Sequence, residues 1–468
     1  LSRAADKVTV GMLDPRDRDL VADVSKRLGR PVQPVQLNAY EIRQALARIY
    51  GLPLGEGEGR LLRLDSAAEI RFAPGQAAPE ILAGILGEAI RRRATDIHLE
   101  AYEGDADVRL RVDGVLLQIS TPLSPDNHIR VISRIKVLCG LDPVERRHAQ
   151  DGHFGILWME GEKTRRIDVR VSILPGAHGQ DAALRLLDPR RFEPDLEGLG
   201  MSAAMKAQCR RLLRRPHGLI LTCGSTGSGK TTTLYAFIDA LRGGDLKVLT
   251  VEDPVERELP KVNQKAVTGQ MGFSDYLRAF LRSNPDVILV GEIRDRETAE
   301  VAIRAATTGH LVLSTLHTKD ALGAVARLRS LGVSDDLLSD VLSGVIGQRL
   351  VRRVCDQCSA PVEPREDLVR EYCGSSPVRG FSRGRGCASC WTTGYKGQVG
   401  VFELLRPDAR FLEALGRGAT MEELRRIASE TGWVPMVEDA VTKAEAGLTT
   451  LEEVARRFVP LEHRRKED

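Results

Sequence analysis

The sequence predicts an α/β protein whose largest domain contains a mostly parallel sheet covered by helices. Continuous apolar runs indicate buried strands at residues 219–221, 248–251, 287–290 and 311–314, since strands covered on both faces lose polar alternation. Helical patterns separate these runs, and alternating strands and helices favour parallel βαβ units. Because such folds bind ligands at the carboxyl ends of their strands, the polar motifs that follow these runs are the candidate functional residues.

The motif GSTGSGKT occupies residues 224–231 and matches the phosphate-binding pattern G-x-x-x-x-G-K-[ST] in full. An apolar run precedes it and a helical pattern follows, which is the context that distinguishes a phosphate loop from an ordinary glycine turn. Glycines let backbone N–H groups turn onto phosphate oxygens, and a helix N-terminus favours negative charge. Lys230 is expected at the terminal phosphates and the Thr231 hydroxyl on Mg²⁺. The other predicted phosphate contacts are Gly224, Ser225, Thr226, Gly227, Ser228, Gly229 and Thr232.

Length and composition limit the alternatives. A chain of 468 residues suggests about three domains. The net charge of +3 is small for this length, so charge alone does not indicate a nucleic-acid partner. No apolar run approaches the roughly 18 residues that span a bilayer, and no signal peptide opens the chain. Of eight cysteines, five lie within residues 355–390, which suits a reduced compartment with one metal site better than a disulfide framework.

The patterning divides the chain into five parts. A small N-terminal α/β domain has a strand near Val8 and helices around residues 20–28 and 42–50. A segment rich in Gly, Pro and charge follows as a linker, and then an α+β domain with period-two strands and a hairpin turn at Asp113. The predicted boundaries are 1–52, linker 53–77, α+β domain 78–192, core 193–405 including a cysteine segment at 350–398, and a helical C-terminal region with a charged tail at 406–468.

Acidic residues follow two of the predicted core strands. The strand at 247–251 leads into Glu252, and the strand at 287–290 leads into Glu292. Hydrolysis of a phosphoanhydride needs one carboxylate to order the metal and another to orient or activate water, and these two glutamates can supply both roles. Asp295 and Glu297 can equally be helix N-terminal residues, because acidic side chains favour first turns.

A histidine and two cysteine pairs are further candidate site residues, and the signal of the cysteine pairs is the stronger. His317 follows the strand at 311–314, where it can sense a terminal phosphate or be a satisfied polar core residue, and spacing does not decide between them. The cysteine pairs fit a closed tetrahedral zinc site better than free thiols. The expected zinc ligands are Cys355, Cys358, Cys387 and Cys390, with Cys373 as a bystander.

Together these motifs resemble the secretion ATPase superfamily, in particular the assembly ATPases of type II secretion and type IV pilus extension. The similarity covers essentially the whole chain. Its core motifs are GSTGSGKTTTLY at 224–235, VEDPVE at 251–256, GEIRDRET at 291–298 and TGHLVLSTLHT at 308–318. Further matches are ATDIHLE at 94–100, QDG at 150–152 and GYKG at 394–397.

The resemblance implies a RecA-like P-loop core, a PAS-like α+β domain before it, and roles for single residues. Glu252 matches the catalytic glutamate of the family's aspartate box, Glu292 its Walker B glutamate and His317 its histidine box. The family also contacts nucleotide phosphates through arginines, for which surface solvation is the alternative explanation. The matching arginines are Arg170, Arg185, Arg278 and Arg282.

The resemblance further implies a cytoplasmic homo-hexamer that splits ATP with Mg²⁺, contains structural Zn²⁺ and powers pseudopilus or pilus assembly. Its N-terminal domain resembles one that docks onto an inner-membrane platform, so peripheral attachment to that membrane is expected. Retraction motors usually lack this domain and the cysteine segment. A nucleic-acid-stimulated motor ATPase is the alternative from another class. The scarcity of aromatic residues (4%) argues against it, because such proteins stack bases on aromatic side chains. A nucleotide-sensing scaffold without turnover is a third possibility, and the intact acidic motifs argue against it.

Overall fold

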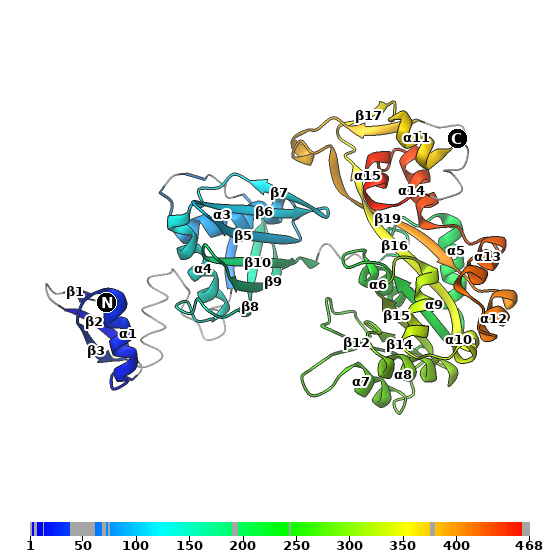
Figure 1. Ribbon diagram of the computed structural model, residues 1–468, viewed down its shortest axis with the longest axis horizontal. Helices are drawn as coiled ribbons and strands as arrows, with labels where there is room; N and C mark the ends of the chain where they lie inside the picture. Colours follow the sequence, from blue (N-terminus) through cyan, green and yellow to red (C-terminus); the bar gives the residue numbers. More distant parts are fainter. Residues whose placement is uncertain are drawn as a thin grey trace. The chain divides into compact units, whose positions relative to one another are not determined.

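The computed structural model describes residues 2–3, 7–12, 14–37, 61–67, 72–73, 75–189, 195–242, 245–374 and 380–460 (Figure 1). The chain divides into two compact units, Leu1–Pro189 and Arg190–Asp468. Each unit has its own sheets and its own buried apolar core. The chain is therefore a mixed α/β protein, as the sequence predicts.

The N-terminal end of the first unit contains a small sheet with the order β1-β2-β3. Its elements are β1 (Ser2–Arg3), β2 (Val8–Met12), α1 (Arg18–Leu28) and β3 (Val32–Gln36). Asp17 caps α1 by accepting from the Leu20 amide, and Gly29 ends it in the left-handed region. β2 and β3 are parallel, so α1 is the crossover helix. The helix expected at residues 42–50 lies outside the described residues.

The larger sheet of the first unit has seven strands in the order β4-β8-β9-β10-β5-β6-β7. Its strands are β4 (Leu61–Asp65), β5 (Asp96–Tyr102), β6 (Asp105–Val112), β7 (Val115–Ile119), β8 (Gln150–Glu160), β9 (Lys163–Pro175) and β10 (Gln180–Leu187). Helices α3 (Ala78–Arg91) and α4 (Pro125–Cys139) contribute to the same apolar core. Along β9, buried residues alternate with exposed ones, so one face of the sheet meets the core and the other is polar.

Strand β4 differs from the linker expected at residues 53–77. It pairs in parallel with β8, and Leu62 and Leu64 pack against the core of the unit. The strand has an apolar pattern of only five residues, and glycine and charged residues dominate the composition of the segment around it. The sequence pattern therefore predicts a linker here rather than a strand. Residues 53–60 of the expected linker lie outside the described residues.

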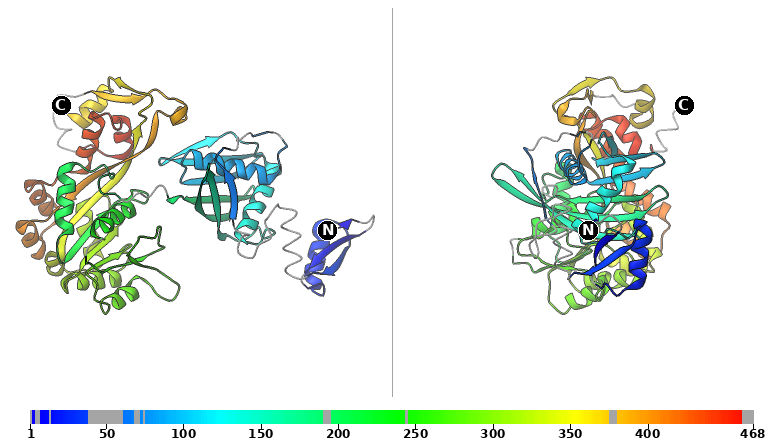
Figure 2. Two further views of the ribbon diagram at one scale, coloured as in Figure 1. Left: turned by 180° about the vertical axis from the view of Figure 1, so that it is seen from behind. Right: turned by 90° about the vertical axis from the view of Figure 1, so that its left-hand side faces the viewer.

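The second unit is built on a seven-stranded sheet with the order β13-β12-β14-β15-β11-β16-β19. Figure 2 shows the ribbon of this unit, in green to red, from two further sides. All neighbouring pairs are parallel except β16 and β19. Its strands are β11 (Gly218–Cys223), β12 (Val248–Glu252), β13 (Asn263–Ala266), β14 (Val287–Val290), β15 (Leu311–Leu316), β16 (Leu342–Val354) and β19 (Tyr395–Leu405).

Helices cover both faces of this sheet. They are α5 (Ala203–Leu213), α6 (Lys230–Leu241), α7 (Phe273–Phe280), α8 (Arg296–Thr307), α9 (Ala321–Ser330) and α10 (Asp335–Val341). Leu219 and Leu221 of β11 join the core formed with α7 to α10, whereas Ile220 joins the core formed with α5 and α6. Both faces of β11 are therefore buried, which explains its continuous apolar sequence.

The C-terminal elements extend the second unit. They are β17 (Ser359–Val362), α11 (Glu366–Cys373), β18 (Phe381–Gly384), a 3₁₀ turn (Ala388–Cys390), α12 (Ala409–Gly416), α13 (Met421–Glu430), α14 (Met436–Glu445) and α15 (Leu451–Arg457). Helices α11, α14 and α15 share an apolar cluster with β16 and β19. The charged tail at 462–468 lies outside the described residues. Within the described part of the chain, no helix has the length and apolar character needed to cross a bilayer.

Glu403 on β19 joins two of these helices to the sheet. Its side-chain oxygens accept from the amide of Ala321 (2.6 Å) and from that of Met436 (3.0 Å), the first residues of α9 and α14. The residue is only 2% exposed. Burial raises the pKa of Glu403 from 4.5 to about 7, although the two amide donors oppose this shift.

This raised pKa predicts a pH dependence of stability. Between pH 4.5 and pH 7 the folded protein holds a proton on Glu403 that the unfolded chain releases, so this contribution to the free energy of unfolding falls as pH rises. Glutamine at this position does not titrate. We therefore expect the free energy of unfolding of Glu403→Gln to fall between pH 5 and pH 8 by about 2–3 kcal/mol less than that of the wild type. Chemical denaturation at the two pH values measures it, with the exposed Glu413→Gln as control. Parallel pH dependence of Glu403→Gln and wild type would contradict the prediction.

Candidate nucleotide-binding and hydrolysis site

The phosphate loop joins β11, near the middle of the core sheet, to the N-terminus of α6. Gly224, Gly227 and Gly229 have φ values of 155°, 74° and 87°, a region that side chains rarely adopt. A Cβ on Gly224 would also lie 2.4 Å from the carbonyl oxygen of Gln348 on β16. Glycine is thus required at this position both for the backbone conformation and for the close approach of a neighbouring strand.

Lys230 begins α6 and closes the loop. Its ammonium donates to the carbonyl oxygens of Gly224 (2.9 Å) and Ser225 (3.1 Å), and the residue is 8% exposed. Burial lowers the pKa of Lys230, and the nearby Glu292 carboxylate opposes this shift. Thr231 follows in the first turn of α6 and is partly exposed. The lysine and threonine of the motif therefore lie at the helix N-terminus, where anionic groups are stabilised.

Glu252 ends β12, which is separated from β11 in the sheet by β14 and β15. It is only 4% exposed and accepts from the Thr250 hydroxyl (2.5 Å), from the Gln264 amide nitrogen (3.1 Å) and from the Tyr235 hydroxyl. Tyr235 comes from α6, so the glutamate connects the helix of the phosphate loop to β12 and β13. Donors surround the carboxylate because a buried charge without partners would be strongly destabilising.

Glu292 lies in a more open environment. It follows β14, forms an ion pair with Arg294 and lies 3.5 Å from Nε2 of the half-exposed His317, which follows β15. Arg294 also contacts Asp253 at 3.3 Å. Burial lowers the pKa of His317, and the charge of Lys230 acts in the same direction, so the imidazole is neutral near pH 7. Glu292, His317 and Lys230 therefore form one electrostatic group beside the phosphate loop.

Other polar residues of the motifs do not join this group. Asp295 caps α8 by accepting from the Thr298 amide at 2.8 Å, and Glu297 pairs with Arg278 at 2.6 Å. His310 lies at the opposite end of β15 and approaches the Ala305 carbonyl oxygen at 2.9 Å. The helix N-terminal alternative thus accounts for Asp295, and a local structural contact accounts for His310.

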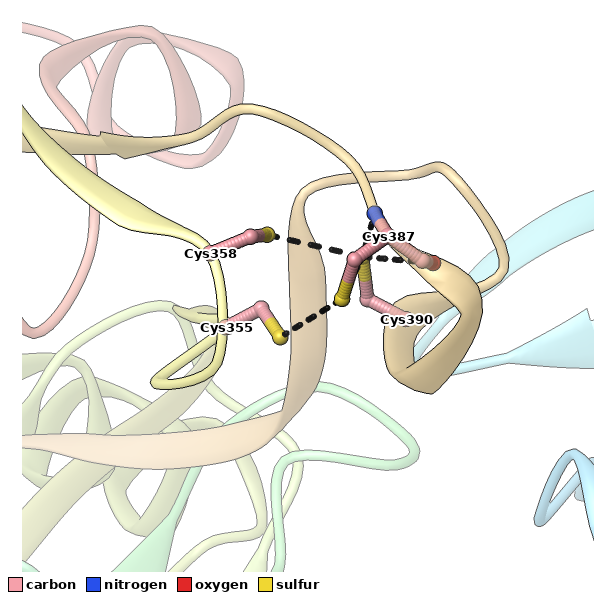
Figure 3. A group of neighbouring side chains, drawn as sticks. All are labelled: Cys355, Cys358, Cys387 and Cys390. Carbon is pink, nitrogen blue, oxygen red and sulfur yellow. Dashed lines mark hydrogen bonds between the residues drawn. The ribbon is translucent and has the colours of Figure 1, made fainter.

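Four cysteines form a second site at the end of β16 and around the 3₁₀ turn before β19. Figure 3 shows their side chains gathered together, with sulfur distances of 3.9 Å (Cys355–Cys387) and 3.8 Å (Cys358–Cys390). All four sulfurs lie within 4.8 Å of one another. Zn–S bonds of about 2.3 Å place the sulfurs of a tetrahedral site about 3.8 Å apart, so the spacing fits zinc. Cys373 lies instead in the apolar cluster around α11.

The cysteine site also has backbone donors that favour thiolates. The amides of Cys387 (3.2 Å) and Gly394 (3.3 Å) donate to Sγ of Cys390. Burial raises the pKa of the Cys390 thiol, but hydrogen bonds, these two among them, lower it by more than burial raises it. The net result is a pKa of about 7, below the ordinary value of 9.0. Because thiolates are the form that binds metal, the surroundings of Cys390 suit a metal ligand.

Comparison with known proteins identifies the family to which the chain belongs. The family model described as "Type II/IV secretion system protein" matches residues 75–456, and a model of the MshEN domain matches residues 1–56. The chain belongs to the type II/IV secretion system protein family. It is therefore a P-loop ATPase, as the resemblance implies.

Relatives of this secretion ATPase cover nearly its whole length. It is 36% identical over 470 residues to "Type II secretion system ATPase E" of Vibrio cholerae, with 96% of this chain and 92% of that protein covered. It is 37% identical to "Type IV pilus assembly ATPase PilB" of Thermus thermophilus, with 97% and 52% covered. Among solved structures, "Pilus Retraction Motor PilT and Bound ADP" has a TM-score of 0.53 and 29% identity, over 81% of this chain and 96% of that one. The expected fold class is thereby confirmed.

The four arginines expected at nucleotide phosphates lie on exposed surfaces of the secretion ATPase. In the second unit, Arg278 on α7 pairs with Glu297, and Arg282 donates to the Arg278 carbonyl oxygen at 3.0 Å. In the first unit, Arg170 and Arg185 are register partners on β9 and β10, and Arg185 pairs with Asp96 at 3.1 Å. Arg185 and Arg278 thus form surface ion pairs, and the role of all four arginines at a nucleotide stays a prediction.

Three residues of the site were given no role from the sequence, although Tyr235 ends the motif at 224–235. Gln348 on β16 is 1% exposed and donates to the carbonyl oxygen of Ser228 at 2.7 Å. Tyr235 and Gln264 contact Glu252, as described above. A glutamine inside a largely apolar strand is a weak signal of a buried contact, but its partner lies 120 residues away.

Proposed function

We propose that this chain is a Mg²⁺-dependent ATPase motor that powers pseudopilus assembly in type II secretion or type IV pilus extension. The observation that carries the proposal is that Lys230, Glu252 and Glu292 lie at or beyond the carboxyl ends of three parallel strands of one sheet, β11, β12 and β14. Phosphoryl transfer depends on positioning and on charge stabilisation, which such a group provides. Relatives named for both systems support the coupling of this chemistry to secretion or pilus assembly.

Each residue has a defined task in this proposal. The Thr231 hydroxyl and Glu292 hold or order Mg²⁺, and Lys230 neutralises the terminal phosphates. The loop from Gly224 to Gly229, with Thr232, cradles the phosphates through its amides. Glu252 orients or activates the attacking water, and His317 senses the terminal phosphate through Glu292.

The arginines act in the same proposal as partners of the phosphates. Arg170, Arg185, Arg278 and Arg282 would exchange surface contacts for charge-assisted bonds to the nucleotide.

The proposed assembly is a cytoplasmic homo-hexamer attached peripherally to the inner membrane. Residues 1–52 would dock onto an inner-membrane platform, and part of 53–77 would act as a tether while the motor moves. The domains at 78–192, 193–405 and 406–468 would form the ring. The relatives' printed roles in type II secretion and pilus assembly support this arrangement.

Substitutions in the site test the proposed hydrolysis. Glu252→Gln keeps the shape of the side chain but removes the base, so we expect kcat to fall by about 10²–10⁴-fold with ATP binding retained. Lys230→Ala removes the charge at the phosphates and should weaken ATP binding itself. Phosphate release and calorimetric titration with ATP measure the two effects. Glu258→Gln, exposed in the same loop, is the control, and wild-type turnover by Glu252→Gln would reject the mechanism.

We also propose that Cys355, Cys358, Cys387 and Cys390 bind one structural Zn²⁺. The sulfur spacing and the donors to Cys390 support a closed tetrahedral site. Such a site would stabilise the segment between β16 and β19, whose two-stranded sheet of β17 and β18 is small.

Metal analysis tests this site with a matched pair of cysteine variants. We expect about one zinc per chain in the wild type and in Cys373→Ser, and nearly none in Cys358→Ser. The melting temperature of Cys358→Ser should fall because the segment loses its metal constraint. Equal zinc content in Cys358→Ser and Cys373→Ser would contradict the assignment.

Addition of DNA distinguishes the motor proposed here from a nucleic-acid-stimulated ATPase. Many exposed arginines are already paired with carboxylates, as for Arg278, Arg294 and Arg296, and the net charge is only +3. We therefore expect DNA to change the rate of phosphate release by less than about twofold at low salt. Strong stimulation that disappears as salt is raised would favour the nucleic-acid motor instead.

A further inference from the structure

The carboxylate of Glu252 is enclosed by side chains from three elements. Thr250 of β12, Gln264 of β13 and Tyr235 of α6 each donate one hydrogen bond to it. A carboxylate has about four acceptor sites, so three protein donors leave one for a water molecule. The geometry therefore suits a base that is held firmly while it binds a single water.

Tyr235 also holds the loop that follows Glu252. Its hydroxyl accepts from the Glu256 amide at 3.3 Å while it donates to the Glu252 carboxylate. Burial raises the pKa of Tyr235, so the hydroxyl stays protonated and able to donate. One buried hydroxyl thus joins the end of β12 to the loop beyond it.

Gln264 holds the other side of the same loop. Its amide nitrogen donates to the Glu252 carboxylate (3.1 Å) and to the Arg257 carbonyl oxygen (3.0 Å), and its amide oxygen accepts from the Leu259 amide (2.6 Å). Both hydrogens of the amide are used, so its orientation is determined by the network. Gln264 therefore positions Glu252 and the loop together.

The position of Tyr235 on α6 connects this network to the phosphate loop. Tyr235 lies four residues after Thr231, so the two side chains share one face of the helix. A displacement of the first turn of α6 on nucleotide binding would therefore move the hydroxyl that holds Glu252.

We propose that Tyr235 and Gln264 are positioning residues for hydrolysis, which hold Glu252 at the place from which it orients water and which couple it to α6. This inference rests on the proposed role of Glu252 as the catalytic glutamate. Small displacements of a catalytic group reduce rates strongly, even when substrate binding is unaffected. Loss of either positioning residue should therefore affect kcat much more than KM.

A double-mutant cycle tests the proposal. Tyr235→Phe should lower kcat by about tenfold or more and change KM for ATP by less than about threefold. In the Glu252→Gln background, Tyr235→Phe should cause no further decrease, because its effect acts through Glu252. Tyr372→Phe is the matched control, since Tyr372 is also buried and donates to a carbonyl oxygen, that of Phe458 (2.8 Å), in the C-terminal region. Its kcat should equal that of the wild type.

The possible results separate this inference from the function on which it rests. A fully active Glu252→Gln protein would overturn the role of Glu252 itself. An impaired Glu252→Gln protein with effects that multiply in the double variant would overturn only the positioning role. An unchanged kcat in Tyr235→Phe would do the same. If Tyr235→Phe does not fold, Gln264→Met replaces it in the same cycle. This substitution removes another of the donors to Glu252 and keeps a side chain of similar length.

Discussion

The close packing of the phosphate loop against β16 is the constraint on which the site depends. The strand comes so near that no side chain fits on Gly224, and Gln348 uses the contact to hold the Ser228 carbonyl oxygen. Gly347, the neighbour of Gln348, faces Glu403 on β19 with equally little space. Glu403 in turn binds the first amides of α9 and α14. Backbone conformation, strand order and helix placement around the loop are therefore determined by one chain of short contacts.

The two glutamates of the site differ in environment, and this difference suits two tasks. Glu252 is buried and accepts from three neutral donors, so its position is fixed without a nearby cation. Glu292 is more open and contacts Arg294 and the neutral imidazole of His317. A bound metal can displace these partners at modest cost, because an exposed ion pair such as that with Arg294 contributes little. A fixed carboxylate suits water orientation, whereas an exchangeable one suits metal binding.

Local patterns predicted the parts of this molecule that depend on neighbouring residues in the sequence. The buried strands, the phosphate loop and the cysteine pairs each have a signature within about a dozen residues, and the structure contains them where the patterns lie. Strand β4 did not stand out, because its partner β8 is some 90 residues later and its own pattern is short. Gln348, Tyr235 and Gln264 were missed for a similar reason. Their value lies in single contacts across the fold, which neither periodicity nor composition records.

Strand β16 connects the two sites of the second unit, because it contacts the phosphate loop and ends next to the first cysteine. It runs from Leu342 to Val354, so only six residues of this strand separate Gln348, which holds the phosphate loop, from the first cysteine, Cys355. Near the cysteines, Arg352 of β16 donates to Glu453, which is fully buried on α15, and stacks over Tyr395 of β19. The C-terminal helix therefore stabilises the far half of β16, and the near half of the same strand supports the loop that binds phosphate.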